Sequence, residues 1–177
     1  PLWLTVTMKG FAGHAGSVPM NLRQDALLGA AEVIRSLNRI VKQDNESPAV
    51  GTVGNIEVFP NSRNIIPEQV RFTIDLRDID NERRDRYERH LAEAIREAAE
   101  QYHLAYEIRE DTRSAPRYCA EWIKAIVAQE AKALDLSAPE LMSGPFHDAL
   151  AMSNVCDYGM IFVRCKDGIS HNPAEYA

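Results

Sequence analysis

Two histidines lie in short segments rich in glycine and proline, where an imidazole could take part in chemistry. His171 lies in residues 168–175, Gly-Ile-Ser-His-Asn-Pro-Ala-Glu, and a rigid, exposed loop of this kind suits a metal ligand. His14 lies in residues 13–16, Gly-His-Ala-Gly, whose small side chains let the ring reach outward and let a ligand approach. For either histidine alone, a structural or surface-turn role is the alternative interpretation.

A metal site requires several ligands, and the sequence offers no obvious set to accompany His171. We therefore expect at most one partial metal site in this chain. Either His171 is not a ligand, or the chain is part of a larger enzyme, and we favour the second interpretation. The sequence begins in a strand-like segment without methionine and stops directly after residues 168–175, which favours a piece of a longer protein.

Two further polar side chains occupy positions where the backbone restricts their orientation. Asn64 lies in a loop, residues 60–67, that begins and ends with proline, so its amide donor and acceptor could be presented in one orientation. Arg77 ends a strand-like segment and could bind a carboxylate through two parallel N–H groups. The alternatives are an Asx turn at Asn64 and a surface ion pair of Arg77 with Asp75 or Asp78.

Composition excludes several classes of protein. A chain of 177 residues with 45% hydrophobic and 26% charged residues is ordinary for a soluble globular protein. The net charge of -6 provides no basic surface for nucleic acid, and no apolar run approaches the roughly 20 residues that cross a bilayer. Three cysteines without CxxC spacing indicate reduced thiols, so we expect a cytoplasmic protein that binds neither nucleic acid nor membrane.

Hydrophobic periodicity predicts an α/β chain whose first part has the order β-α-β-β-α-β, the ferredoxin-like pattern. One face of its sheet should carry both helices and the other should be open. The expected elements are strands over residues 2–9, 51–59, 70–77 and 104–109, and helices over residues 21–43 and 80–102.

The remaining residues predict helices over 118–134 and 149–154 and an apolar strand over 159–163. A polar segment ending in proline, residues 111–116, separates them from the first part. They contain too little sheet to stand as a domain of their own.

Taken together, these loops resemble the binuclear-metal amidohydrolases of the metallopeptidase-like family. The resemblance is closest to the branch that cleaves carbamoyl and ureido groups, namely N-carbamoyl-L-amino acid hydrolases, allantoate amidohydrolases and β-ureidopropionases. The motifs that carry it are residues 13–20 with Arg23 and Asp25, residues 52–54, 60–67 and 75–77, Ser-Gly-Pro-Phe-His-Asp-Ala at 143–149, and residues 168–175.

The resemblance implies two parts of one enzyme. Residues 1–113 would be the lid or dimerisation domain, of mixed α+β structure, and residues 114–177 an incomplete C-terminal portion of the catalytic α/β domain. The intact enzyme would be a homodimer through the lid and would hold two divalent metal ions (Zn, Mn, Co or Ni). It would hydrolyse a small-molecule carbamoyl or ureido substrate with a metal-activated water.

The resemblance also implies roles for single residues. His171 would be a metal ligand, and His14 would reach the neighbouring subunit's active site to stabilise the developing oxyanion. Asn64 and Arg77 would bind the substrate, Arg77 through its carboxylate. Phe146 would line the substrate pocket, and because this branch usually has glycine there, the phenyl ring should narrow or reshape the pocket.

Two other functions are consistent with parts of the sequence. An aminoacylase or dipeptidase relative would share the lid and the metal centre. A non-catalytic ferredoxin-like dimerisation module would share the lid fold only. The module predicts that His14, Asn64 and Arg77 can be replaced without consequence, and it gives no reason for residues 143–175.

Overall fold

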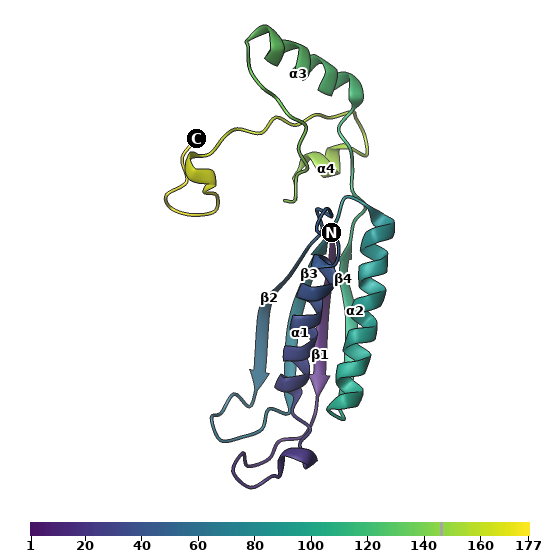
Figure 1. Cartoon of the computed structure of the whole chain (residues 1–177), viewed down its shortest axis with the longest axis vertical. Helices are drawn as coiled ribbons and strands as arrows, with labels where there is room; N and C mark the ends of the chain where they lie inside the picture. The colour runs from purple at the N-terminus through teal and green to yellow at the C-terminus, as the bar shows by residue number, and fades with distance from the viewer. Residues whose placement is uncertain (146) are drawn as a thin grey trace. The chain divides into compact units, whose positions relative to one another are not determined.

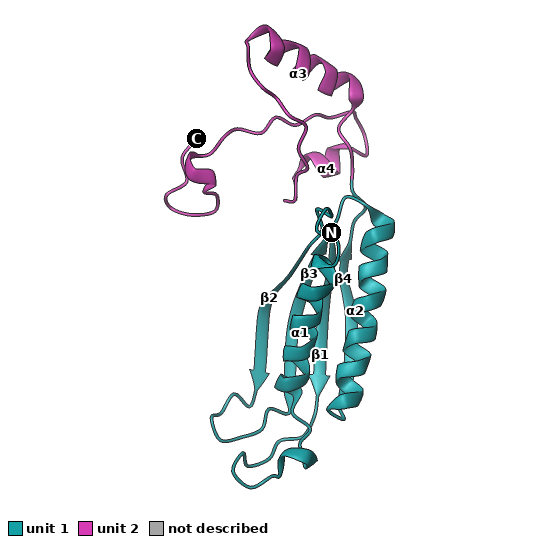
Figure 2. Ribbon diagram, viewed as in Figure 1, with its two compact units in different colours: residues 1–116 teal, residues 117–177 magenta. Residues whose placement is uncertain are grey.

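The computed structural model describes residues 1–145 and 147–177. Phe146, expected to line a substrate pocket, lies outside the described residues. The chain divides into two compact units, residues 1–116 and residues 117–177 (Figure 2), and each is described by itself. Among the described residues, no helix combines the length and the apolar character that a membrane span requires.

Unit 1 is a four-stranded antiparallel sheet with two helices on one face (Figure 1). The strands lie in the order β2-β3-β1-β4, so the expected ferredoxin-like topology is confirmed. In chain order the elements are β1 (Leu2–Lys9), the 3-10 turn η1 (Met20–Leu22), α1 (Ala26–Lys42), β2 (Val50–Phe59), β3 (Gln69–Arg77), α2 (Asn81–Gln101) and β4 (Ala105–Arg113).

The core lies between the sheet and the two helices. Along β3, Val70, Phe72, Ile74 and Leu76 are almost fully buried, while the residues between them face the other side. Apolar side chains of β1, α1 and α2 complete the same cluster. The alternating pattern of β3 therefore sets which face of the sheet receives the helices, as the sequence predicts.

In unit 1, two boundaries differ by more than one residue from the expected ones, for local reasons. The first helix begins at Ala26 because residues 20–22 form the separate turn η1 and the Asp25 carboxylate accepts hydrogen bonds from the N–H groups of Leu27 and Leu28. The fourth strand runs on to Arg113 because its last residues pair with the start of β1.

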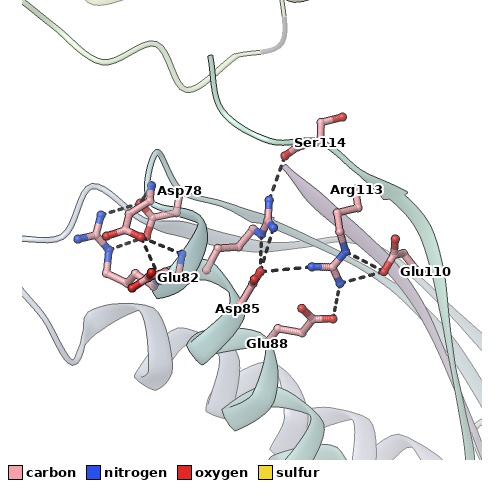
Figure 3. A network of polar contacts seen from close by, with 10 residues as sticks. Asp78, Glu82, Asp85, Glu88, Glu110, Arg113 and Ser114 are labelled. Carbon is pink, nitrogen blue, oxygen red and sulfur yellow. Dashed lines mark hydrogen bonds and ion pairs between the residues drawn. The ribbon is translucent and has the colours of Figure 1, made fainter. Parts of the chain in front are cut away.

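A network of ion pairs fastens the end of β4 to the first turns of α2 (Figure 3). Arg113 binds Glu88, Glu110 and Asp85 through its guanidinium group. The buried Arg84 also binds Asp85 and donates to the main-chain oxygen of Ser114 at 3.0 Å. The carboxylates of Glu88 and Glu110 hold the pKa of Arg113 above its usual range, so the network keeps its charge.

The open face of the sheet carries a second polar contact that makes stability depend on pH. Thr5 donates its hydroxyl hydrogen to Asp111 at 2.5 Å, and Arg109 binds the same carboxylate. Both partners lower the pKa of Asp111, Thr5 the more strongly. Since the folded-state pKa lies below the unfolded value of about 3.9, this stabilisation is present above that value and is lost as pH falls through the folded-state pKa.

We predict that Thr5→Val makes the unfolding free energy less sensitive to acid. Urea unfolding of the chain at pH 6 and at pH 3 measures how much unfolding free energy is lost on acidification. This loss should be smaller in the variant than in the unaltered chain. Thr73→Val is the matched control, because Thr73 pairs with Thr5 across the sheet on the same face. An equal acid-dependent loss in both variants would contradict the assignment.

Unit 2 contains α3 (Glu121–Ala133), the short α4 (Ala149–Met152) and the 3-10 turn η2 (Lys166–Gly168). The expectation of a strand over residues 159–163 is wrong, since this segment is not paired in any sheet of the described structure. A strand requires a partner for its backbone groups, and the described part of unit 2 contains no other strand to pair with it. Ile161, Phe162 and Val163 are consequently exposed.

Candidate functional site

The structure brings His14 and Asn64 together at one end of the sheet, although 50 positions separate them in the chain. Ala15 donates its N–H to the main-chain oxygen of Asn64 at 2.9 Å, and Ile66 donates to Gly13 at 2.8 Å. His14 and Ile65 form an isolated antiparallel bridge between these bonds. The two loops, which follow β1 and precede β3, lie beside each other at the same end of unit 1 (Figure 1). These backbone contacts join residues 13–15 and 64–66 into one platform, which carries the side chains of both His14 and Asn64.

Both side chains on this platform are exposed to solvent, and each has one polar atom fixed by its own loop. The Nδ1 atom of His14 accepts a hydrogen bond from the N–H of Gly16 at 3.0 Å. The side-chain oxygen of Asn64 accepts from the hydroxyl of Ser62 at 3.0 Å. The imidazole and the amide are thus oriented before any ligand arrives, which suits two polar groups that bind one small molecule.

Arg77 lies at the opposite end of the sheet. It ends β3, whereas the His14 and Asn64 loops adjoin the start of that strand, where Gln69 pairs with Lys9. At the usual rise of a strand, roughly 25 Å separates the two ends of β3. A single copy of this chain therefore does not bring Arg77 to the same small ligand as His14 and Asn64.

The Arg77 guanidinium pairs with Asp75 on the open face, as one of the two sequence interpretations expects. Its Nε and Nη2 atoms lie 2.7 to 3.0 Å from the Asp75 carboxylate, and both side chains remain partly exposed. The hydrogen bond to Asp75 is the main cause that raises the pKa of Arg77, so the charge is retained. Asp75 holds the guanidinium in place at the sheet surface.

His171 lies in the exposed turn that follows η2 and has a left-handed backbone with φ 56°. Its N–H donates to the Glu175 carboxylate at 2.8 Å, which closes the turn. Within residues 1–145 and 147–177, no three His, Cys, Asp or Glu side chains converge on a point that could hold a metal ion. The donor set of the described residues thus does not form a metal centre by itself.

The structure adds contacts that the sequence interpretation does not single out. In unit 2 the Ser143 hydroxyl lies 2.5 Å from Nε2 of His147. In unit 1, Arg23 binds two main-chain oxygens of the His14 loop. The nearness of Arg23 to the Gly-His-Ala-Gly motif was the available signal for its contact with the His14 loop. A serine and a histidine four residues apart are too common in sequences to indicate the contact of Ser143 with His147.

Comparison with known proteins places this chain in a family. Residues 2–103 match the model of the peptidase dimerisation domain. The chain is 44% identical over 177 residues to an N-carbamoyl-L-amino-acid amidohydrolase of Pseudomonas sp. (strain NS671), covering 100% of this chain and 43% of the relative. It is 37% identical over 199 residues to an allantoate deiminase of Arabidopsis thaliana, covering 98% of this chain and 38% of the relative.

A solved structure is similar in both sequence and fold. It is an amidase of the hydantoinase/carbamoylase family from Burkholderia multivorans, with a TM-score of 0.92 and 34% identity over 99% of this chain and 43% of that one. This chain thus spans less than half the length of the relatives it matches. The match over most of unit 1 shows that the chain belongs to the peptidase dimerisation domain family.

Proposed function

We propose that this chain is part of a metal-dependent amidohydrolase that cleaves the C–N bond of a carbamoyl or ureido group. Residues 1–113 form its lid or dimerisation domain, and residues 114–177 belong to its catalytic domain. The names of the relatives and the division into units 1–116 and 117–177 support this proposal. The observation that carries it is the platform on which His14 and Asn64 are presented together.

The platform suits the charge that develops when water attacks a carbonyl carbon. The tetrahedral intermediate places negative charge on the former carbonyl oxygen, and a fixed N–H donor stabilises that charge. Because Nδ1 of His14 accepts a hydrogen bond from the Gly16 N–H, the exposed ring has Nε2–H available as such a donor. The Asn64 amide supplies a second polar group for the substrate, held by Ser62.

A homodimer through unit 1 explains why Arg77 lies far from the platform. The strand β2 lies at one edge of the four-stranded sheet and has exposed apolar residues, among them Val50 and Ile56. If β2 pairs antiparallel with the β2 of a second copy about a two-fold axis, the start of each β2 strand lies opposite the end of the other. The Arg77 end of one protomer would then face the His14 end of the other, so that one substrate reaches both.

Substrate assays of the full-length protein test the proposed activity. We expect release of the carbamoyl or ureido nitrogen from N-carbamoyl-L-amino acids or from allantoate. Dipeptides and N-acyl amino acids are the competing substrates, because the family is named for peptidases. If the protein hydrolyses only dipeptides or N-acyl amino acids, the aminoacylase or dipeptidase alternative replaces the proposal. No turnover of any of these substrates would favour the non-catalytic module.

The metal requirement yields a prediction for His171. Amidohydrolases of this family are generally metal-dependent, and we propose that His171 is one ligand of a centre whose other ligands lie in the rest of the enzyme. His171→Ala in the full-length protein should lower the bound divalent metal, measured by elemental analysis after dialysis. His103→Ala is the control, since His103 lies in unit 1, outside residues 168–175.

The same proposal predicts the behaviour of the 177-residue chain. Titration calorimetry with zinc or manganese should show no tight site, because no three potential ligand side chains converge among its described residues. Tight binding of a metal ion to this chain, or unchanged metal content in full-length His171→Ala, would contradict the assignment of His171.

A further inference from the structure

The His14 imidazole is held from one side by the backbone of its own loop. The N–H of Gly16 donates to Nδ1 at 3.0 Å, and the Ser17 hydroxyl lies 3.3 Å from the same atom. Because Nδ1 accepts a hydrogen bond from a backbone N–H, a neutral ring in this arrangement carries its proton on Nε2. The proton position follows from the hydrogen-bond partners of the ring.

Glycine at position 16 lets the ring come this close. A Cβ atom there would lie 3.2 Å from Cε1 and 3.4 Å from Nδ1 of His14. The first of these separations is tighter than ordinary van der Waals contact, so a side chain would press on the ring. Gly16 therefore contributes both the donor and the space that the imidazole occupies.

Arg23 braces the segment that holds the ring. Its Nε donates to the main-chain oxygen of Val18 at 3.0 Å, and its Nη2 donates to that of Ala15 at 2.6 Å. These two oxygens flank Gly16 and Ser17, the residues that contact Nδ1. A planar guanidinium can bind both oxygens at once, whereas a lysine ammonium lacks this fixed fork of donors.

We propose that Arg23 and the Gly16 N–H are positioning groups that hold His14 as the Nε2–H tautomer with its donor directed away from the loop. Neither group contacts the substrate. The catalytic consequence rests on the proposed function, in which the Nε2–H donates to the oxyanion. The tautomer itself is a property of unit 1 and can be measured without activity.

Nitrogen-15 NMR of the imidazole rings in the 177-residue chain tests the tautomer directly, at a pH where the rings are neutral. His14→Gln assigns the His14 signals by their loss. We expect His14 to show an unprotonated Nδ1 and a protonated Nε2, with Arg23→Met and Gly16→Pro each moving it toward a mixture of tautomers. Arg89→Met, which changes an exposed arginine of α2, should leave the signals unchanged.

Two results would overturn the inference. The first is a His14 ring in the unaltered chain that shows the same mixture of tautomers as the exposed His90. The second is an Arg23→Met chain that keeps the His14 signals of the unaltered chain. Backbone amide signals of the sheet check that each variant is folded, and if Gly16→Pro disturbs them, Arg23→Met decides the question.

Kinetics of the full-length protein separate a positioning role from a structural one. Arg23→Met should lower kcat by about tenfold or more, with a smaller change in KM, because a displaced donor weakens binding of the transition state. In a protein that already carries His14→Gln, Arg23→Met should not lower kcat further. The same loss in both backgrounds would assign Arg23 a purely structural role. If His14→Gln leaves activity unchanged, the proposed function of His14 fails, while the tautomer remains decided by NMR.

Discussion

Replacing His14 by glutamine in the full-length protein should lower kcat by about a hundredfold or more, with little change in KM. The donor at this position acts on charge that exists only in the transition state, so its loss slows the chemical step more than it weakens substrate binding. The His14 ring is exposed and its loop is tied to the Asn64 loop by backbone bonds, so the change should not unfold unit 1.

The matched control for His14 is His90→Gln. His90 is an exposed histidine of α2 and lies outside both loops of the platform. Steady-state kinetics on N-carbamoyl amino acids, with circular dichroism to confirm folding, measure both variants. Equal activity of His14→Gln and His90→Gln would favour a lid without a catalytic role and would remove the main support for the proposed function.

Arg77→Met should raise KM and reduce kcat/KM on substrates with a free carboxylate by roughly tenfold to a hundredfold. A hydrogen bond to a charged group contributes about 1.5 to 3 kcal/mol, so removing one such contact corresponds to this reduction of kcat/KM. The carboxamide analogue of the same substrate should lose much less, since it offers no negative charge. The ratio of kcat/KM for the acid and the amide therefore reports on Arg77 more directly than either value alone.

Arg71→Met is the control for this specificity change. Arg71 lies on the same strand and face as Arg77, and its partner on the neighbouring strand is Glu57 at 3.4 Å. It should leave the ratio of acid to amide turnover unchanged. A loss of similar size on both substrates in Arg77→Met would mean that the arginine serves only its ion pair with Asp75.

The fold of unit 1 was predictable because its signals are local and agree with one another. Alternation of Val70, Phe72, Ile74 and Leu76 defines a strand with one buried face. The Asp80 carboxylate accepts from two N–H groups at the start of α2, as expected for a residue of this type at a helix start. With helical and strand periods in the order β-α-β-β-α-β, few topologies other than the ferredoxin-like one remain.

The candidate site was predictable only in part. Glycine and proline mark the loops of His14 and Asn64, but nothing in the spacing of two residues 50 positions apart predicts that their backbones bond. Alternation places Arg77 on the face opposite Phe72, as observed, yet its distance from His14 follows only from the register of β1 and β3. The prediction of a strand over residues 159–163 is wrong because an apolar run indicates burial but does not supply a partner strand.

Mixing two inactive variants tests the central claim, which is that His14 of one subunit completes the active site of the other. Full-length His14→Gln and His171→Ala proteins are mixed, their subunits are exchanged, and activity is followed. If His14 acts across the dimer, each mixed dimer contains one intact site, and random exchange restores about a quarter of the unaltered activity. If both residues serve the same subunit, no dimer contains an intact site, and a mixture as inactive as its components would contradict the claim.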